Sequence, residues 1–148
     1  MDARLQKRVQ RYGWDRASAE YARYLQAQLE SVQSRLLEIA SLQAGEKVLD
    51  VACGNGLVSF RSAQAVGAEG LVVGDDISQE MVNRAEARRR KNDVLNLRFA
   101  RRDAEQPVSD DEVPFDVALC ALGLIYGAGS GRRARRYAAR ALLRQSSR

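Results

Sequence analysis

The chain has 148 residues, of which 45% are hydrophobic and 29% are charged, a composition typical of one globular domain. It contains no histidine, and its two cysteines, Cys53 and Cys120, lie far apart and outside any CxxC spacing, which excludes Ser-His and Cys-His nucleophile pairs, His-bearing zinc sites and a disulfide scaffold. The formal net charge is +5, but seven arginines between residues 127 and 148 carry all of the excess, and subtracting them leaves a net charge of −2 for residues 1–126.

The N-terminal part of the chain predicts helix. Apolar side chains recur at steps of three and four residues across residues 16–40, which is the spacing of one helix face. The members of this stripe are Tyr21, Leu25, Leu29, Val32, Leu36 and Ile39. Asp15 or Ser18 could cap the start of the helix. Whether the region forms one helix or two with a break near Ser31 stays open.

Strand and helix signals then alternate as far as residue 120. Short apolar runs predict strands over residues 47–51, 71–74, 95–100 and 115–120. Helices are predicted over residues 57–66, and from an N-cap at Ser78 to a break at residues 92–93. Residues 104–114, acidic and carrying both prolines, predict a loop. This order is typical of an α/β fold with a parallel sheet covered by flanking helices.

The most informative segment is the turn between the first predicted strand and the helix after it. Gly54 and Gly56 let the backbone approach a ligand closely there. Asp76, 20 residues after Gly56 at the end of the second strand, can accept two hydrogen bonds from a ribose diol. These parts predict a site for an adenosine-containing cofactor. The dinucleotide pattern GxGxxG has its third glycine where this chain has Ser59, which weighs against an NAD(P)-binding oxidoreductase fragment without excluding it.

Four blocks of sequence carry a more specific resemblance. They are VLDVACGNG at residues 48–56, VGDDIS at 73–78 with Met81 after it, RDAE at 102–105 and FDVALC at 115–120. In order and spacing they resemble class I S-adenosylmethionine-dependent methyltransferases, in particular the group that includes the ubiquinone/menaquinone-biosynthesis enzymes. The resemblance implies a Rossmann-like sheet of which this chain supplies about four strands, in the order 3-2-1-4. It also implies S-adenosyl-L-methionine as cofactor and a small molecule as methyl acceptor.

The resemblance assigns one group of residues to the methionine end of the cofactor. Backbone around Cys53, Gly54 and Gly56 holds the methionine part, Asp50 supports this loop and the amino group, and Cys120 lines the methyl-transfer cavity. No catalytic base is nominated, because methyl transfer from a sulfonium is an in-line displacement to which the protein contributes position and electrostatics. No metal is implied.

A second group is assigned to the adenosine end. Asp76 takes the ribose hydroxyls, Ile77 or Met81 packs on the adenine, and Asp103 accepts from the adenine amino group with Ala104 beside the ring.

Two positions depart from the family pattern. Asp75 stands where an apolar residue is common, which leaves open whether Asp75 or Asp76 faces the ribose. Arg102 stands where glycine is common, and it could pair with Asp103 and compete with the adenine for that carboxylate.

The sequence predicts three segments: a helical lead-in over residues 1–45, an S-adenosylmethionine-binding half-domain over residues 46–126 and a basic tail over residues 127–148. The composition of the tail is typical of a truncated or out-of-frame terminus. Without a following strand, the edge of the fourth strand could pair with a second copy of the chain. A third hypothesis is a non-enzymatic module that binds acidic partners or nucleic acid through the arginine tail. The mildly acidic remainder makes nucleic acid the less favoured partner.

No apolar run approaches the ~20 residues of a membrane-spanning helix. The first eight residues, MDARLQKR, lack the apolar core of a secretory signal. Together with the sparse cysteines, this predicts a cytoplasmic protein without a membrane span.

Overall fold

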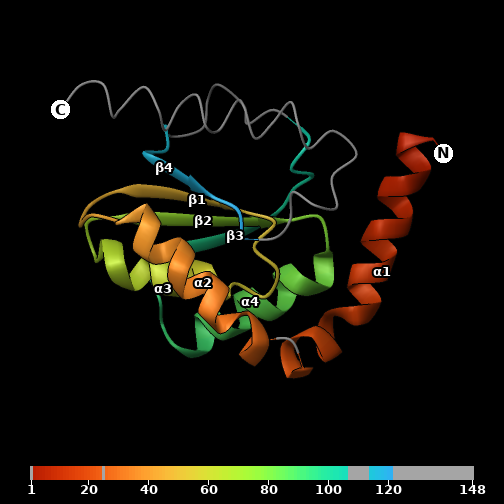
Figure 1. Cartoon of the computed structure of the whole chain (residues 1–148), viewed down its shortest axis with the longest axis horizontal. Coiled ribbons are helices and arrows are strands. Elements are labelled where there is room, and N and C mark those ends of the chain that lie inside the picture. Colours follow the sequence, from red (N-terminus) through yellow and green to blue (C-terminus); the bar gives the residue numbers. More distant parts are fainter. Residues whose placement is uncertain (1, 25, 107–113, 122–148) are drawn as a thin grey trace.

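The computed structural model describes residues 2–24, 26–106 and 114–121. Its elements follow in the order α1 (Ala3–Tyr24), α2 (Gln26–Ala40), β1 (Lys47–Val51), α3 (Leu57–Val66), β2 (Leu71–Asp76), α4 (Gln79–Lys91), β3 (Leu97–Arg101) and β4 (Val117–Leu119) (Figure 1). Residues 107–113 of the loop predicted over residues 104–114 lie outside the described residues, as does the predicted basic tail.

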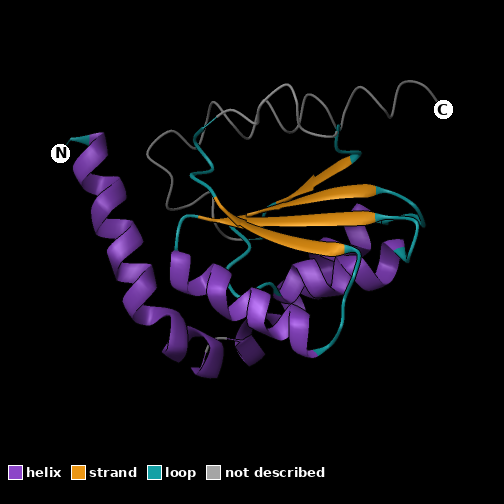
Figure 2. Cartoon of the chain, turned by 180° about the vertical axis from the view of Figure 1, so that it is seen from behind, coloured by secondary structure: helices purple, strands orange, loops and turns teal. Residues whose placement is uncertain are grey.

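The four strands form one parallel sheet in the order β3-β2-β1-β4, which confirms the predicted fold class and strand order. In its register Val48 of β1 lies opposite Val72 of β2 and Val117 of β4. Helices α2, α3 and α4 cover one face of the sheet (Figure 2). Strands of β-branched and other apolar residues pack there against the helices and form the core. The buried members of this core are Val48, Val58, Ala63, Val66, Val72, Leu97 and Leu119.

The face of α2 that packs on the core shares Leu36 with the predicted apolar stripe but is rotated away from Val32 and Ile39. Leu36, Leu37 and Ala40 pack against the core cluster, whereas Val32 and Ile39 are 47% and 69% exposed. Both sets of residues have helical spacing, so periodicity alone cannot choose between the two faces. Which face of α2 packs inward depends on how its side chains fit against the sheet and against α3.

The helical region begins well before the apolar stripe over residues 16–40 that indicated a helix, and α2 continues through Ser31. Helix α1 begins at Ala3, and the two helices are bounded by Tyr24 and Gln26 instead of breaking near Ser31. The expected caps, Asp15 and Ser18, lie inside α1. The helix predicted over residues 16–40 does not include the first half of α1, although Leu5, Val9 and Tyr12 have helical spacing there; their side chains are 51%, 59% and 71% exposed.

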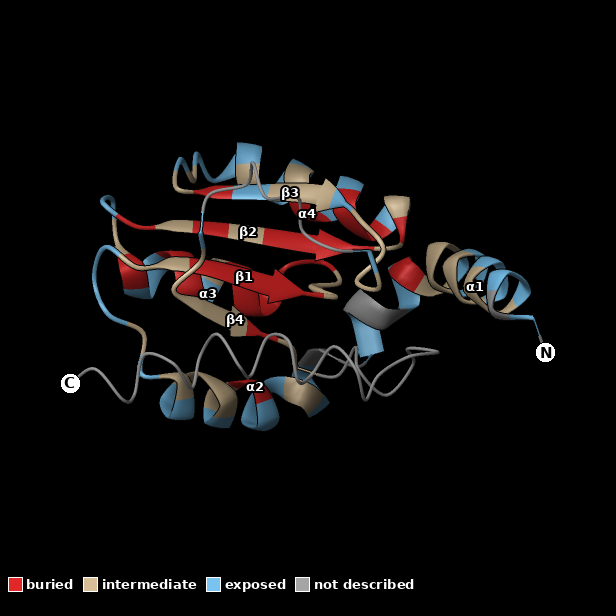
Figure 3. Ribbon diagram, turned by 90° about the horizontal axis from the view of Figure 1, so that it is seen from above, coloured by how far each residue is buried: buried red, intermediate tan, exposed pale blue. Residues whose placement is uncertain are grey.

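Helix α1 lies beside the arrowhead ends of the strands, which are their carboxyl ends (Figure 3). This is the edge of an open α/β sheet at which ligands bind. None of the helices in the described ranges combines the length and the apolar character that crossing a membrane requires.

Candidate functional site

Strand β1 runs into a tight turn at residues 52–56, and β2 fixes the backbone of that turn. The Cys53 N–H donates to the Asp75 carbonyl oxygen at 2.8 Å, and the Gly54 N–H donates to Oδ2 of Asp76 at 2.8 Å. Gly56 has a φ of +87°, and a Cβ built on it would lie 2.7 Å from Cζ of Phe99. Both the backbone angle and the lack of space therefore require glycine at this position.

Two buried carboxyl groups lie below the turn. Asp50 is 1% exposed, and its Oδ2 accepts from the Ser59 hydroxyl at 2.5 Å. Asp75, also 1% exposed, accepts from the Ala52 N–H at 3.4 Å and lies 3.7 Å from Nη1 of Arg102. Burial raises the pKa of Asp50 to about 7; the Ser59 hydrogen bond opposes the rise and the negative charge of Asp75 adds to it. A cationic group of a ligand placed here would favour the ionised form of Asp50.

Asp76 joins the turn to the start of α4. While its Oδ2 accepts from Gly54, its Oδ1 accepts from the Ser78 N–H at 2.9 Å. Burial raises the pKa of this carboxyl group, and the backbone N–H groups of Ser78 and Gly54 act in the opposite direction. The Ile77 N–H also interacts with this carboxylate. Because each carboxylate oxygen can accept two hydrogen bonds, the group keeps capacity for a further donor from a ligand. Of the two aspartates that the sequence left open, Asp76 accepts from the N–H of Gly54, whereas Asp75 accepts from the N–H of Ala52 and is almost fully buried.

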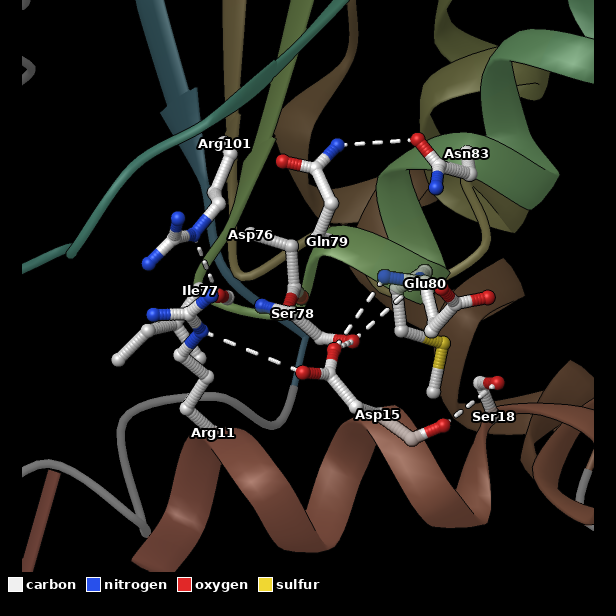
Figure 4. A network of polar contacts seen from close by, with 11 residues as sticks. Arg11, Asp15, Ser18, Asp76, Ile77, Ser78, Gln79, Glu80, Asn83 and Arg101 are labelled. Carbon is white, nitrogen blue, oxygen red and sulfur yellow. Dashed lines mark hydrogen bonds and ion pairs between the residues drawn. The ribbon is translucent and has the colours of Figure 1, made fainter. Parts of the chain in front are cut away.

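Ser78 caps α4 as predicted, by accepting from the Met81 N–H at 3.2 Å. Its hydroxyl in turn donates to Oδ1 of Asp15 on α1 at 2.6 Å, and the Glu80 N–H donates to the same oxygen at 3.2 Å (Figure 4). Arg11 lies 4.0 Å from the other oxygen of Asp15. Asp15 thus helps to cap α4 and holds α1 against the carboxyl end of β2.

Three of the residues predicted for the methionine end meet at one small cavity of about 40 Å³. Asp50, Cys53 and Gly54 line it, together with Ala121 after β4 and Gln33 of α2. Burial raises the pKa of the Cys53 thiol, so the neutral thiol is favoured. Gln33 was not predicted, although a polar residue within an otherwise apolar helix face was a usable signal.

A larger cavity of about 460 Å³ lies on the other side of Asp76. Ile77 and Asp103, both predicted for the adenosine end, line it with cationic residues. These cationic residues are Lys7, Arg8 and Arg11 of α1 and Arg101 and Arg102 at the end of β3. The helix that brings three of them was not predicted to reach this place.

The carboxylate of Asp103 has a different partner from the one expected. Its Oδ2 lies 2.9 Å from Nζ of Lys7, which also lies 2.6 Å from Oε2 of Glu105. Its Oδ1 accepts from the Glu105 N–H at 2.8 Å. Arg102, the expected partner, instead lies within ion-pair distance of Asp75. The reason is that Asp75 is almost fully buried beside β3 and needs a neighbouring cation, whereas Lys7 reaches Asp103 from α1.

Met81, Ala104 and Cys120, which were also predicted for the site, line neither of these two cavities. Met81 is 2% exposed and belongs to the core below α4. Ala104 and Cys120 are half-buried, and Cys120 directly follows β4, the neighbour of β1. Both cysteines are free thiols. In the described ranges, no group of three or more Cys, Asp or Glu side chains is arranged to hold a metal ion.

Residues 42–140 match the family model described as a methyltransferase domain. The chain is 36% identical over 86 residues to the arsenite methyltransferase of Halobacterium salinarum, covering 57% of this chain and 22% of that protein. It is 42% identical over 72 residues to a 23S rRNA (uracil(1939)-C(5))-methyltransferase of Acinetobacter baumannii, covering 49% and 16%. It is 36% identical over 89 residues to the ubiquinone/menaquinone biosynthesis C-methyltransferase of Idiomarina loihiensis, covering 60% and 35%. The chain therefore spans 16–35% of the length of these relatives.

Solved structures agree in fold. A SAM-dependent methyltransferase from Aquifex aeolicus superimposes with a TM-score of 0.60 at 24% identity, covering 71% of this chain and 57% of that one. The YcgJ protein from Bacillus subtilis superimposes with a TM-score of 0.62 at 26% identity, covering 75% and 45%. Each superposition covers a larger share of this chain than of the solved structure.

Proposed function

The chain belongs to the methyltransferase domain family, within the class I S-adenosylmethionine-dependent methyltransferases, and from this premise we propose that its glycine turn binds S-adenosylmethionine for methyl transfer to an acceptor. The observation that carries the proposal is the contact between the Gly54 N–H and the Asp76 carboxylate at 2.8 Å. This contact places the glycine backbone next to the carboxylate that we propose for the ribose. Both lie at the carboxyl ends of neighbouring parallel strands, where ligands bind in open α/β sheets.

The residues of the two cavities fit the two ends of this cofactor. The turn around Cys53, Gly54 and Gly56 receives the methionine part, and Asp50 offers a carboxylate to its ammonium group. We also place Cys120 near the methyl group that is transferred, at the same end of the cofactor. Bound S-adenosylmethionine supplies an activated methyl group on a sulfonium, and the protein contributes position, charge and exclusion of water.

At the adenosine end, Asp76 accepts from the ribose hydroxyls, and Ile77 forms an apolar wall for the adenine. Asp103 accepts from the adenine amino group with Ala104 beside the ring, which requires Lys7 to share or leave this carboxylate. Met81 supports this wall from the core of α4.

A small-molecule acceptor is the second part of the proposal. The net charge of −2 over residues 1–126 disfavours a polyanionic acceptor. Two of the relatives named above are named for arsenite and for ubiquinone/menaquinone biosynthesis. The relative named for 23S rRNA is the counterexample, and an RNA acceptor is therefore an outcome that the assay must include.

The cofactor proposal is tested by calorimetry and thermal unfolding with S-adenosylhomocysteine and, separately, with NAD⁺. We expect heat and a raised melting temperature with S-adenosylhomocysteine only, because a ligand at 100 times its Kd stabilises the folded state by about 2.7 kcal/mol. The variant Asp76→Asn is expected to weaken binding roughly tenfold, and the exposed Glu69→Gln serves as its control. Absence of binding to S-adenosylhomocysteine, or binding of NAD⁺ alone, would overturn the proposal.

A further inference from the structure

Gln33 is a buried polar side chain on α2, whose other polar side chains, where their burial is described, are exposed or, at Ser34, half-buried. It is 7% exposed, and it alone is buried among the α2 side chains whose burial the structure describes. Within the described part of the chain its carboxamide makes no hydrogen bond. The polar atoms of this carboxamide are not among the fully buried side-chain atoms that lack a partner in the described residues, so they remain accessible at the cavity that Gln33 lines. Gln33 therefore has two N–H donors and one carbonyl acceptor available for a ligand.

The cavity that Gln33 lines has the size of a small polar group. It measures about 40 Å³, and a water-sized group needs roughly 10–15 Å³ of such space. About three such groups therefore fit, which matches an ammonium and a carboxylate on one carbon but not a purine ring. The other walls are Asp50 near the end of β1, the turn at residues 52–55, and the apolar side chains of Leu57, Val58 and Ala121. Gln33 of α2 and Asp50 of β1 contribute polar side chains to this lining from two different elements.

The chemistry of these walls is complementary to an α-amino acid. A carboxylate at Asp50 attracts an ammonium group, and the low exposure of the site strengthens that attraction. The carboxamide N–H groups of Gln33 can donate to an α-carboxylate, and its carbonyl can accept from the ammonium. An acidic residue at position 33 would repel the carboxylate, so an uncharged amide suits both charges of the ligand.

We propose that Gln33 binds the amino-acid end of the cofactor and makes the site selective for S-adenosyl compounds that carry this end. The inference deepens the proposed function and rests on it. Because the adenosine part would lie beyond Asp76 in the larger cavity, Gln33 is not expected to affect ligands that consist of adenosine alone.

The test compares two ligands on one variant. Gln33→Leu keeps the size of the side chain and removes its hydrogen bonds. Calorimetry with S-adenosylhomocysteine should show an affinity lower by roughly 10- to 100-fold, as expected for hydrogen bonds to charged groups. The affinity for 5′-methylthioadenosine, which has the same thioether but no amino acid, should stay within twofold. Gln28→Leu, at an exposed position of the same helix, is the matched control and should change neither affinity.

Other results separate the inference from the proposed function. An unchanged affinity for S-adenosylhomocysteine, or equal losses for both ligands, would show that Gln33 is structural and would overturn the inference alone. If the wild-type chain binds neither ligand, the proposed function itself fails. If circular dichroism shows that Gln33→Leu folds poorly, the variant Gln33→Glu provides the test instead. Its negative charge should weaken binding of S-adenosylhomocysteine and leave binding of 5′-methylthioadenosine unchanged. Equal effects on the two ligands would contradict the inference.

Discussion

At the scale of single residues, burial strongly changes the chemistry of Asp50. Its pKa rises from 3.8 to about 7 at the end of β1. Between these values the unfolded chain releases a proton that the folded chain keeps. The stability associated with protonated Asp50 is therefore fully present below pH 3.8 and is lost as the pH rises through about 7. The ammonium group of a bound cofactor would offset this loss.

The variant Asp50→Asn is expected to remove this pH dependence, since an amide of the same shape carries no charge. At pH 8 its free energy of unfolding should exceed that of the wild type by on the order of 2 kcal/mol, and near pH 4 the difference should shrink toward zero. Urea unfolding between pH 4 and pH 8 measures both values. The exposed Glu30→Gln on α2 is the control. A constant difference across this range would contradict the pKa assignment.

At the scale of elements, the connection from β1 through the glycine turn to α3 determines where a ligand can lie. Its geometry depends on β2 and β3 as much as on its own sequence, because Phe99 of β3 fills the space beside Gly56. The Phe99 ring also leaves no room for a Cβ at Gly74 of β2, where its Cδ1 would be 2.8 Å away. One aromatic side chain thus requires glycine on two neighbouring elements.

Two glycine substitutions separate backbone strain from crowding. Gly45 has a φ of +83° with no atom within 4 Å of a built Cβ, so Gly45→Ala should cost only about 1–2 kcal/mol of left-handed strain. Gly56→Ala meets the same strain and also Phe99, and should cost about 1–3 kcal/mol more. Urea unfolding of both variants provides the comparison. Equal losses would mean that Phe99 moves aside freely, contrary to the packing described.

At the scale of the whole molecule, α1 is joined to the body through polar contacts at two places. Asp15 holds the start of α4, and Lys7 holds Asp103 and Glu105 after β3. Exposed fractions of 31% for Lys7 and 19% for Asp103 indicate an ion pair that salt can screen. The same contact occupies the carboxylate proposed for the adenine, so we expect docking of α1 and binding of the cofactor to compete for Asp103.

The variant Lys7→Met tests this competition. Its affinity for S-adenosylhomocysteine should rise severalfold because Asp103 becomes available, whereas stability should change by no more than about 1 kcal/mol, as for other partly exposed ion pairs. The fluorescence of Trp14, the single tryptophan of the chain, reports on α1. Lys91→Met at an exposed position of α4 is the control. A lower affinity would show that Lys7 assists the ligand instead of competing with it.

The sequence by itself determined the alternation of strands and helices, the glycine turn, the acid at the end of β2 and the Ser78 cap, because each depends on residues close together in the chain. The strand order was predicted from the family resemblance. Only the tertiary structure decided that Asp15 caps α4, that Lys7 rather than Arg102 pairs with Asp103, and that α2 turns Gln33 inward. The first two contacts join residues more than 60 positions apart, and the third depends on which of two helical faces fits the sheet. Local pattern specifies the elements and their order, whereas the packing of one element on another determines which side chains meet.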